Sequence, residues 1–320
     1  MQAASPAAAC FGKLPTHGDF VRHHVGDSAG GRGLQAFDGW IQKGLRHSRQ
    51  RLGAAFDAAF DAAPGLCFAL DPPGGEDMLA GALRPSRDST GRRYPFLVSV
   101  SIPRHRVDGR RLPSWPLRYQ AFFAEASALA AEVVAGSIAS ESLPDRLAGL
   151  GDLFGRTPFL VDYENRLRKA QVWPLWARAW GTAEDGQKYV LLKNLTELFA
   201  EARGHPVRLP LRFPFPSTAE ATDASFWLET CWRLHGKPPA EPAFFWPEPE
   251  TDGGLVVALA QPPPALLTHL FTPETSDVGC FYLDDPDGKP TALAALAIPA
   301  AHSALLEDES LSFRAFIDKL

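Results

Sequence analysis

Residues 78–102 read MLAGALRPSRDSTGRRYPFLVSVSI, and they give the clearest indication of the fold class. It contains two apolar runs, 78–83 and 94–102, on either side of a turn-rich loop at 85–93. Short apolar runs bounded by Gly and Pro are typical of buried β-strands. Because a loop of this length has no room for a crossover helix, the two runs are predicted to be antiparallel neighbours in one sheet.

Apolar segments before and after this hairpin extend the predicted sheet and cover it. Residues 8–14 and 66–70 are short apolar runs that end at Pro or Gly, so each is predicted to be a strand. Apolar side chains at helical spacing predict a helix at about 34–52. Residues 117–135 hold Ala, Glu and Phe but neither Gly nor Pro, which predicts a second long helix.

The C-terminal part repeats this mixture of helices and strands on a smaller scale. A proline-rich connection at 206–216 is predicted to divide the chain into residues 1–205 and 206–320. We therefore expect a mixed α+β fold of the α/β class. Its N-terminal unit has a mainly antiparallel sheet flanked by helices, and a smaller C-terminal α/β unit packs on it. The remaining predicted elements are helices at 143–153 (capped by Ser142), 188–203, 226–236 (capped by Asp223 or Ser225) and 265–271, and a strand pair at 244–246 and 255–260.

Composition excludes several classes of function. The chain has 45% hydrophobic and 22% charged residues, a formal net charge of −5 and a pI near 6.0, so no basic field attracts nucleic acid. The N-terminus lacks the pattern of a signal peptide, and the apolar stretch 292–301 is too short to cross a bilayer. We expect a cytoplasmic protein with no membrane insertion. The sequence indicates no oligomeric state.

The cysteines and tryptophans are expected to be structural. Cys10, Cys67, Cys231 and Cys280 lie far apart and have no metal-ligand spacing, so they are predicted to be buried reduced thiols and no metal site is expected. Most of the eight tryptophans are expected to lie in the core, although an aromatic ligand cage is the alternative.

The first segment that carries chemistry is Gly-Lys-Leu-Pro-Thr-His-Gly-Asp-Phe at 12–20. Lys13, His17 and Asp19 lie beside turn-forming Pro and Gly, and Phe20 follows them. One interpretation is a His/Asp acid–base pair, but no nucleophile or metal ligand accompanies it at a recognisable spacing. The favoured interpretation is that these residues shape the loop or contact a partner.

The second segment is the loop at 85–95, where three arginines surround an acid. Arg92 or Arg93 could hold a carboxylate or phosphate through two hydrogen bonds. The alternative is that Asp88 pairs with one of the arginines and fixes the loop internally, which is the commoner arrangement in short charged loops. Signatures of hydrolases, metalloproteases, P-loop and dinucleotide-binding proteins are absent.

At these two loops the sequence resembles the TagF (ImpM) family of type VI secretion-associated proteins. The resemblance is strong over residues 10–102 and weaker at 226–228 and 244–246. The glycine-rich stretch 26–33 departs from the usual family pattern. The matching motifs are Phe11-Gly12-Lys13-Leu14-Pro15-x-His17-Gly18-Asp19-Phe20, Phe37-Asp38-x-Trp40-Ile41-Gln42-x-Gly44-Leu45, Pro64-x-x-x-Phe68-Ala69-Leu70 and Pro85-Ser86-x-Asp88-x-x-Gly91-Arg92-x-Tyr94-Pro95-Phe96.

This resemblance implies a regulator that restrains type VI secretion after translation by binding a forkhead-associated-domain scaffold protein. Such a protein binds and does not turn over a substrate, so we expect no enzyme activity and no cofactor. An anion-binding regulator that uses the Arg92 loop is the second hypothesis, and a His/Asp enzyme is the third. The predicted partner-binding or loop-shaping residues are Lys13, His17, Asp19, Phe20, Asp88, Arg92 and Arg93.

Overall fold

The computed structural model describes residues 6–25, 32–74, 76–138, 140–155, 160–202, 205–272, 279–284 and 291–320. Most of the glycine-rich stretch 26–33 therefore lies outside the described residues. The strands are β1 (Ala7–Lys13), β2 (Phe20–Val25), β3 (Leu66–Leu70), β4 (Asp77–Arg84), β5 (Phe96–Pro103), β6 (Leu211–Phe215), β7 (Ala243–Pro247), β8 (Gly253–Ala258) and β9 (Phe281–Tyr282).

Helices surround these strands. The α-helices are α1 (Arg32–Leu52), α2 (Phe56–Ala62), α3 (Trp115–Arg118), α4 (Gln120–Val134), α5 (Leu143–Gly155), α6 (Leu160–Lys169), α7 (Val172–Trp180), α8 (Gln187–Glu201), α9 (Ala221–His235), α10 (Leu266–Phe271), α11 (Thr291–Ala297), α12 (Ala300–Glu307) and α13 (Phe313–Lys319). Short 3-10 helices are η1 (Gly53–Ala55), η2 (Arg104–Arg106), η3 (Gly109–Ser114) and η4 (Ser140–Ser142).

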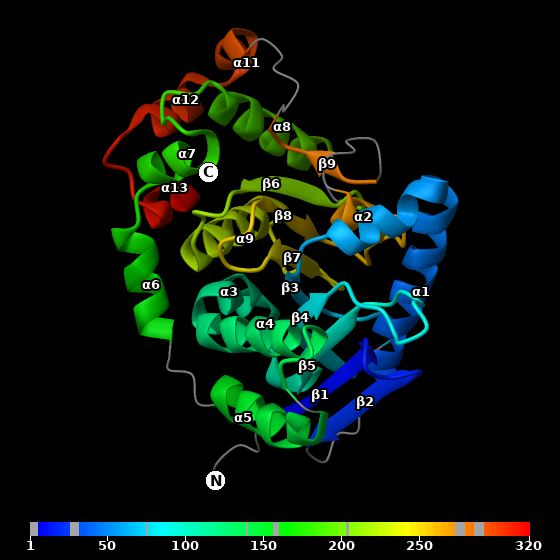
Figure 1. Ribbon diagram of the computed structural model, residues 1–320. Helices are drawn as coiled ribbons and strands as arrows, with labels where there is room; N and C mark the ends of the chain where they lie inside the picture. The colour runs from blue at the N-terminus through cyan, green and yellow to red at the C-terminus, as the bar shows by residue number, and fades with distance from the viewer. Residues whose placement is uncertain are drawn as a thin grey trace.

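The described strands form one nine-stranded sheet in the order β2-β1-β5-β4-β3-β7-β8-β6-β9 (Figure 1). Neighbouring strands are antiparallel, except that the short β9 runs parallel to β6. The predicted hairpin is confirmed, because β4 pairs with β5 from Asp77 opposite Pro103 to Arg84 opposite Phe96. The mixed α+β fold class with a mainly antiparallel sheet flanked by helices is also confirmed.

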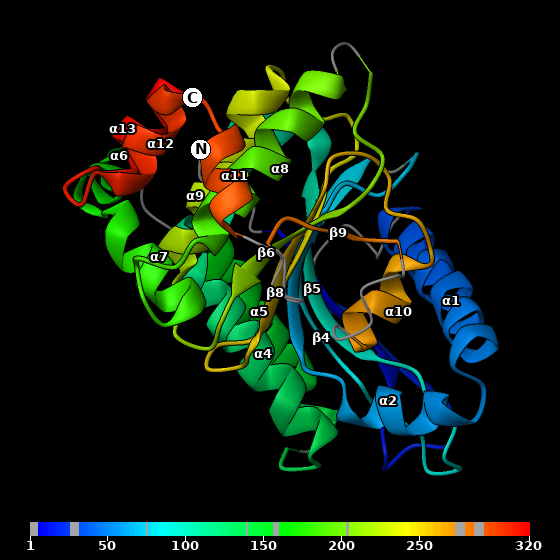
Figure 2. The ribbon, with the colours of Figure 1, turned by 90° about the horizontal axis from the view of Figure 1, so that it is seen from above.

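Helices cover both faces of the sheet, and each face has its own core (Figure 2). Alternate side chains of β1 point to opposite faces, so Ala8 and Cys10 join one core while Ala9 and Phe11 join the other. The helices α3, α4, α5 and α9 contribute to the first core, and α1, α2 and α10 contribute to the second. This layering holds the loops at the ends of β1 and β4 in place.

The sheet continues across the predicted boundary between residues 205 and 206. β3 pairs with β7 over its whole length, from Leu66 opposite Pro247 to Leu70 opposite Ala243. β7 and β8 form the antiparallel pair that the sequence predicted. The C-terminal strands thus lengthen the same sheet, and the division into residues 1–205 and 206–320 stays a prediction.

Two local predictions are wrong. Residues 206–216 are not only a connection, because they contain β6. Pro214 has no N–H, and β6 accommodates it because the neighbouring β9 pairs only as far as Arg212.

The second wrong prediction concerns the cap of α9. This helix is capped by Glu220, not by Asp223 or Ser225. Asp223 is instead the third residue of that helix and accepts from the Glu220 amide over 3.0 Å, which completes a capping box.

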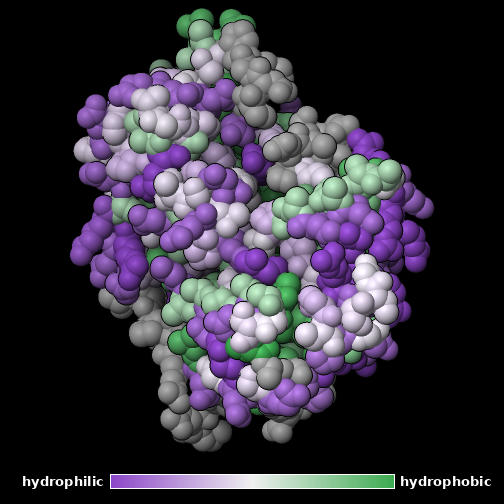
Figure 3. Space-filling view, viewed as in Figure 1, coloured by the Kyte–Doolittle hydropathy of each residue, from purple (hydrophilic) through white to green (hydrophobic). Residues whose placement is uncertain are grey.

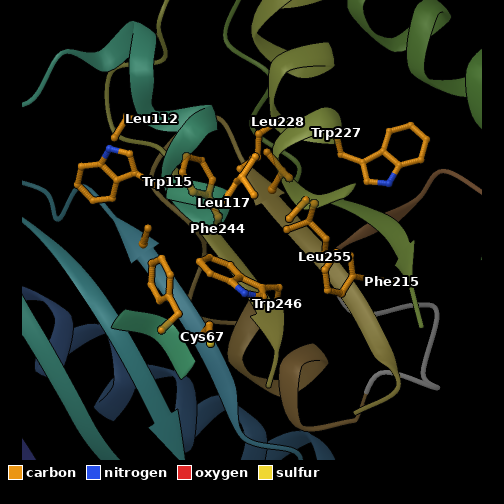
Figure 4. Packing of buried hydrophobic residues seen from close by; sticks show 14 of the residues in the cluster. Cys67, Leu112, Trp115, Leu117, Phe215, Trp227, Leu228, Phe244, Trp246 and Leu255 are labelled. Carbon is orange, nitrogen blue, oxygen red and sulfur yellow. The ribbon is translucent and has the colours of Figure 1, made fainter. Parts of the chain in front are cut away.

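Most tryptophans lie in the core, as predicted. Figure 4 shows Trp115, Trp227 and Trp246 among apolar side chains from several elements, and all three are buried. The four cysteines are also buried and free, which confirms the prediction of buried reduced thiols.

A cluster of exposed apolar side chains is present on α11, at the top of Figure 3, where Leu293 and Leu296 are 65% and 84% exposed.

No helix in the described part of the chain has both the length and the apolar character needed to cross a membrane.

Candidate functional site

The two predicted motifs lie against each other. Residues 14–19, between β1 and β2, contact residues 85–93, between β4 and β5, and we call these two segments the loop pair. The Ser89 amide donates to the His17 carbonyl over 2.9 Å, and Arg92 Nη2 donates to the Gly18 carbonyl over 2.6 Å. Because β1 and β5 are hydrogen-bonded neighbours, segments 74 residues apart in sequence meet at one end of the sheet.

The Asp88 carboxylate holds the loop pair together from inside. Its side chain is fully buried and accepts a hydrogen bond of 2.6 Å from Lys13 Nζ. The amides and side chains of Thr90 and Arg92 donate to it over 2.7–3.0 Å. Although burial by itself raises it, these bonds hold the pKa of Asp88 well below its usual range. The carboxylate is therefore ionised and fixes the conformation of both segments.

Lys13 reaches Asp88 because Gly12 lets the chain pass close to β5. Gly12 has a φ of 144°, and a Cβ atom at this position would lie 2.3 Å from the Pro95 carbonyl oxygen, so only glycine fits. Lys13 is the last residue of β1 and lies opposite Phe20 of β2. Its ammonium group is also 5.1 Å from the centre of the Phe20 ring, which adds a cation–π contact.

Arg93 connects the loop pair to α2. Its guanidinium donates to both carboxylate oxygens of Asp61 over 2.8 and 2.6 Å, and its third nitrogen lies 2.8 Å from Asp57. Hydrogen bonding from Arg93 lowers the pKa of Asp61. Arg93 therefore forms a two-nitrogen pair with the Asp61 carboxylate and is not part of the cluster around Asp88.

Aromatic rings support the loop pair from the side of β2. Phe20 stacks on Phe11 with a centroid distance of 5.1 Å and meets the edge of Tyr94 at 4.9 Å. The Tyr94 hydroxyl donates to Asp38 of α1. Burial and the nearby Asp38 carboxylate raise the pKa of Tyr94 far above its usual value, so this phenol stays protonated.

Four of the predicted side chains face solvent around this rigid base. Phe20 is 43% exposed and the Arg92 side chain 59% exposed. Asp19 is exposed and accepts from the adjacent Phe20 amide, over 2.8 Å. His17 is half-buried, and its ring Nδ1 lies 2.9 Å from the Thr16 hydroxyl. Within the described residues His17 and Asp19 share no hydrogen bond, so they do not form an acid–base pair.

The structure thus brings six predicted residues together at the loop pair, with Lys13 of β1 and Phe20 of β2 at its edge, and it turns the Arg93 side chain toward α2. Asp38, Asp57 and Asp61 also belong to this site, although they were not among the predicted residues. A signal for each was present, since Asp38 lies in a family motif and Asp57 and Asp61 have the i,i+4 spacing of one helix face. The six residues are Lys13, His17, Asp19, Phe20, Asp88 and Arg92.

Two clefts lie elsewhere on the molecule, away from the loop pair. One of about 330 Å³ is lined by residues such as Phe123, Glu220 and Trp246, and one of about 560 Å³ by residues such as Phe199 and His235. No predicted site residue lines either cleft. Over the described ranges no three His, Cys, Asp or Glu side chains are grouped so that they could hold a metal ion.

Comparison with known proteins identifies the region that carries the loop pair. Residues 9–150 match the model of the TagF N-terminal domain, which is described as type VI secretion system-associated. The fold is similar to that of PA0076 from Pseudomonas aeruginosa PAO1, with 18% sequence identity and a TM-score of 0.50, over 88% of this chain and 100% of that one. No curated protein matches the chain. Residues 9–150, which include every predicted site residue, therefore match the TagF N-terminal domain of type VI secretion system-associated proteins.

Proposed function

We propose that this protein is a negative regulator that acts on type VI secretion after translation, in the cytoplasm, by binding a forkhead-associated-domain scaffold protein. The observation that carries the proposal is the match of residues 9–150 to the TagF N-terminal domain, because this match contains the whole loop pair. The resemblance in sequence motifs implies this partner and this mode of action.

The geometry of the loop pair supports binding to a protein surface. Asp88 and Lys13 are buried and fix the backbone, while His17, Asp19 and Arg92 present side chains outward. A surface that is ordered before binding loses little conformational entropy when a partner docks. Exposed polar side chains on such a rigid base suit recognition of a specific protein partner.

The same geometry disfavours the anion-binding hypothesis. Arg92 uses Nε for Asp88 and Nη2 for the Gly18 carbonyl, and Arg93 is held by Asp57 and Asp61. All three nitrogens of Arg93 therefore have carboxylate partners, and the edge formed by Nε and Nη2 of Arg92 is occupied, so neither edge is free for a phosphate or carboxylate ligand. The enzyme hypothesis gains no support either, since His17 contacts Thr16 and not Asp19.

Binding to the purified scaffold tests the proposal directly. Isothermal titration of the full chain with the scaffold from the same secretion cluster is expected to show one binding event. A His17→Ala, Asp19→Ala variant is expected to bind at least about tenfold more weakly, because it loses two outward polar side chains at no cost to the buried network.

The control is Lys193→Ala, Glu197→Ala, which removes an exposed ion pair on α8. It should bind as the wild type does. No heat of binding with the wild-type chain, and no secretion component recovered with it from cells, would reject the proposed function. Equal binding by both variants would keep the function and move the contact surface away from the loop pair.

A further inference from the structure

The strand β2 forms one end of the sheet, beside the loop pair. Within the described part of the chain it pairs with β1 and with no other strand (Figure 1). Alternate residues of such an edge strand direct both their N–H and C=O groups away from the sheet. The Phe20 amide is already bonded to Asp19, so the open part of this edge begins after Phe20.

The two faces of β2 differ. Val21 is buried and belongs to the core that α5 covers. Phe20, Arg22 and His24 alternate with it on the opposite face and are exposed. The open edge is therefore bordered on one side by a packed helix and on the other by accessible side chains.

The exposed face of β2 is cationic. The guanidinium of Arg22 lies 4.8 Å from the centre of the Phe11 ring, which positions it without neutralising it. Among the described residues no carboxylate forms an ion pair with Arg22. The sequence of β2, Phe-Val-Arg-His-His-Val, contains no acidic residue. The strand thus presents backbone groups that no other described strand pairs with, next to the positive charge of Arg22 and the exposed ring of Phe20.

We propose that the open edge of β2 docks an extended acidic segment of a partner protein, which pairs with β2 as an additional strand. Backbone hydrogen bonds would hold the segment, and a carboxylate opposite Arg22 would select an acidic sequence. Apolar residues that alternate with this carboxylate would lie on the other face, on the side of Val21. The proposal deepens the proposed function by naming the surface and the chemistry of the partner, and it rests on that function only for the identity of the partner.

A second copy of this chain is a poorer occupant. Antiparallel pairing of two β2 strands about a two-fold axis at Arg22 places one Arg22 opposite the other. Like charges directly opposite each other destabilise a strand pair. Charge complementarity therefore favours an acidic segment from a different protein.

A synthetic octapeptide of alternating glutamate and valine is the probe, and the same peptide with lysine in place of glutamate is its control. Hydrogen exchange of the full chain is followed over a series of peptide concentrations. We expect the glutamate peptide to slow exchange at alternate amides of residues 21–25, and the lysine peptide to have no effect. Arg22→Glu is expected to weaken the effect at least about tenfold, and Arg22→Gln to a smaller extent.

Arg49→Glu is the matched control variant. Arg49 is also exposed and also lies over a ring, 5.0 Å from the centre of Phe56, but it is on α1. This variant should respond to the peptide as the wild type does, and exchange outside β2 shows whether each variant is folded.

Absence of slowed exchange in β2, equal effects of both peptides, or an unchanged response of Arg22→Glu would overturn the proposal. So would protection of β2 that rises with protein concentration without peptide, which would assign the edge to a second copy. Failure of the scaffold to bind, with the peptide effect intact, would reject the proposed function and retain the docking site.

Discussion

Replacing Lys13 with methionine tests whether the buried ion pair stabilises the loop pair. Methionine keeps most of the apolar stem and removes the ammonium group. The lost hydrogen bond to Asp88 is 2.6 Å long, and the two side chains are only 7% and 0% exposed. A hydrogen bond to a charged group contributes about 1.5–3 kcal/mol, and the contact with the Phe20 ring about 0.5–1 kcal/mol. We therefore expect the free energy of unfolding to fall by about 2–4 kcal/mol.

The assay is urea denaturation followed by both tryptophan fluorescence and circular dichroism, which together show whether unfolding is two-state. Lys193→Met is the matched control. Lys193 and Glu197 also lie 2.6 Å apart, but their side chains are 29% and 55% exposed. Because solvent screens such a pair, this variant should lose less than about 0.5 kcal/mol.

An equal loss of stability in Lys13→Met and Lys193→Met would contradict this expectation. That outcome would mean that the buried pair contributes no more than a surface pair, and that backbone hydrogen bonds alone hold the loop pair. A large loss confined to Lys13→Met would support the assignment of Lys13 and Asp88 to loop shaping.

Three further predictions concern the same region. Hydrogen bonds hold the pKa of Asp88 below its unfolded value despite burial, so the stability that Asp88 contributes is present above about pH 4 and is lost as the pH falls further. Urea titrations at several pH values should therefore show that the free energy of unfolding falls less steeply with acid in Asp88→Asn than in the wild type. Gly12→Ala should destabilise the protein by about 2 kcal/mol or more, measured by thermal unfolding, because its Cβ would overlap the Pro95 carbonyl. Arg93→Ala should raise the pKa of Asp61 toward its ordinary value in a carboxyl NMR titration, and speed amide exchange in α2, while Arg87→Ala should do neither to the same extent.

Much of the fold follows from local patterns in the sequence. The hairpin of β4 and β5 is predictable because two apolar runs are joined by a loop too short for a helix. The helix α1 is predictable from apolar side chains such as Phe37 and Ile41 at helical spacing. The strand β6 was missed because Pro214 and its flanking prolines resemble a linker, and only its neighbours β8 and β9 make it a strand.

The candidate site was predictable as residues but not as an arrangement. The sequence placed Lys13, His17 and Asp19 in one loop and Asp88 and Arg92 in another, since turn-forming residues surround both. It could not assign the partner of Asp88, because Arg87, Arg92 and Arg93 all lie in the same loop and each could have paired with this carboxylate. The sheet order brings Lys13 to the carboxylate and turns Arg93 away to Asp61.

By itself, then, the sequence determined the α+β class, the main hairpin, the covering helices and the family motifs, because each depends on neighbouring residues and their periodicity. The tertiary structure was needed to show that β3 pairs with β7 across the middle of the chain, that Asp88 is buried against Lys13, and that no other described strand pairs with the edge of β2. These features depend on which distant apolar surfaces pack together, and a buried charge must then pair with whichever opposite charge that packing places beside it.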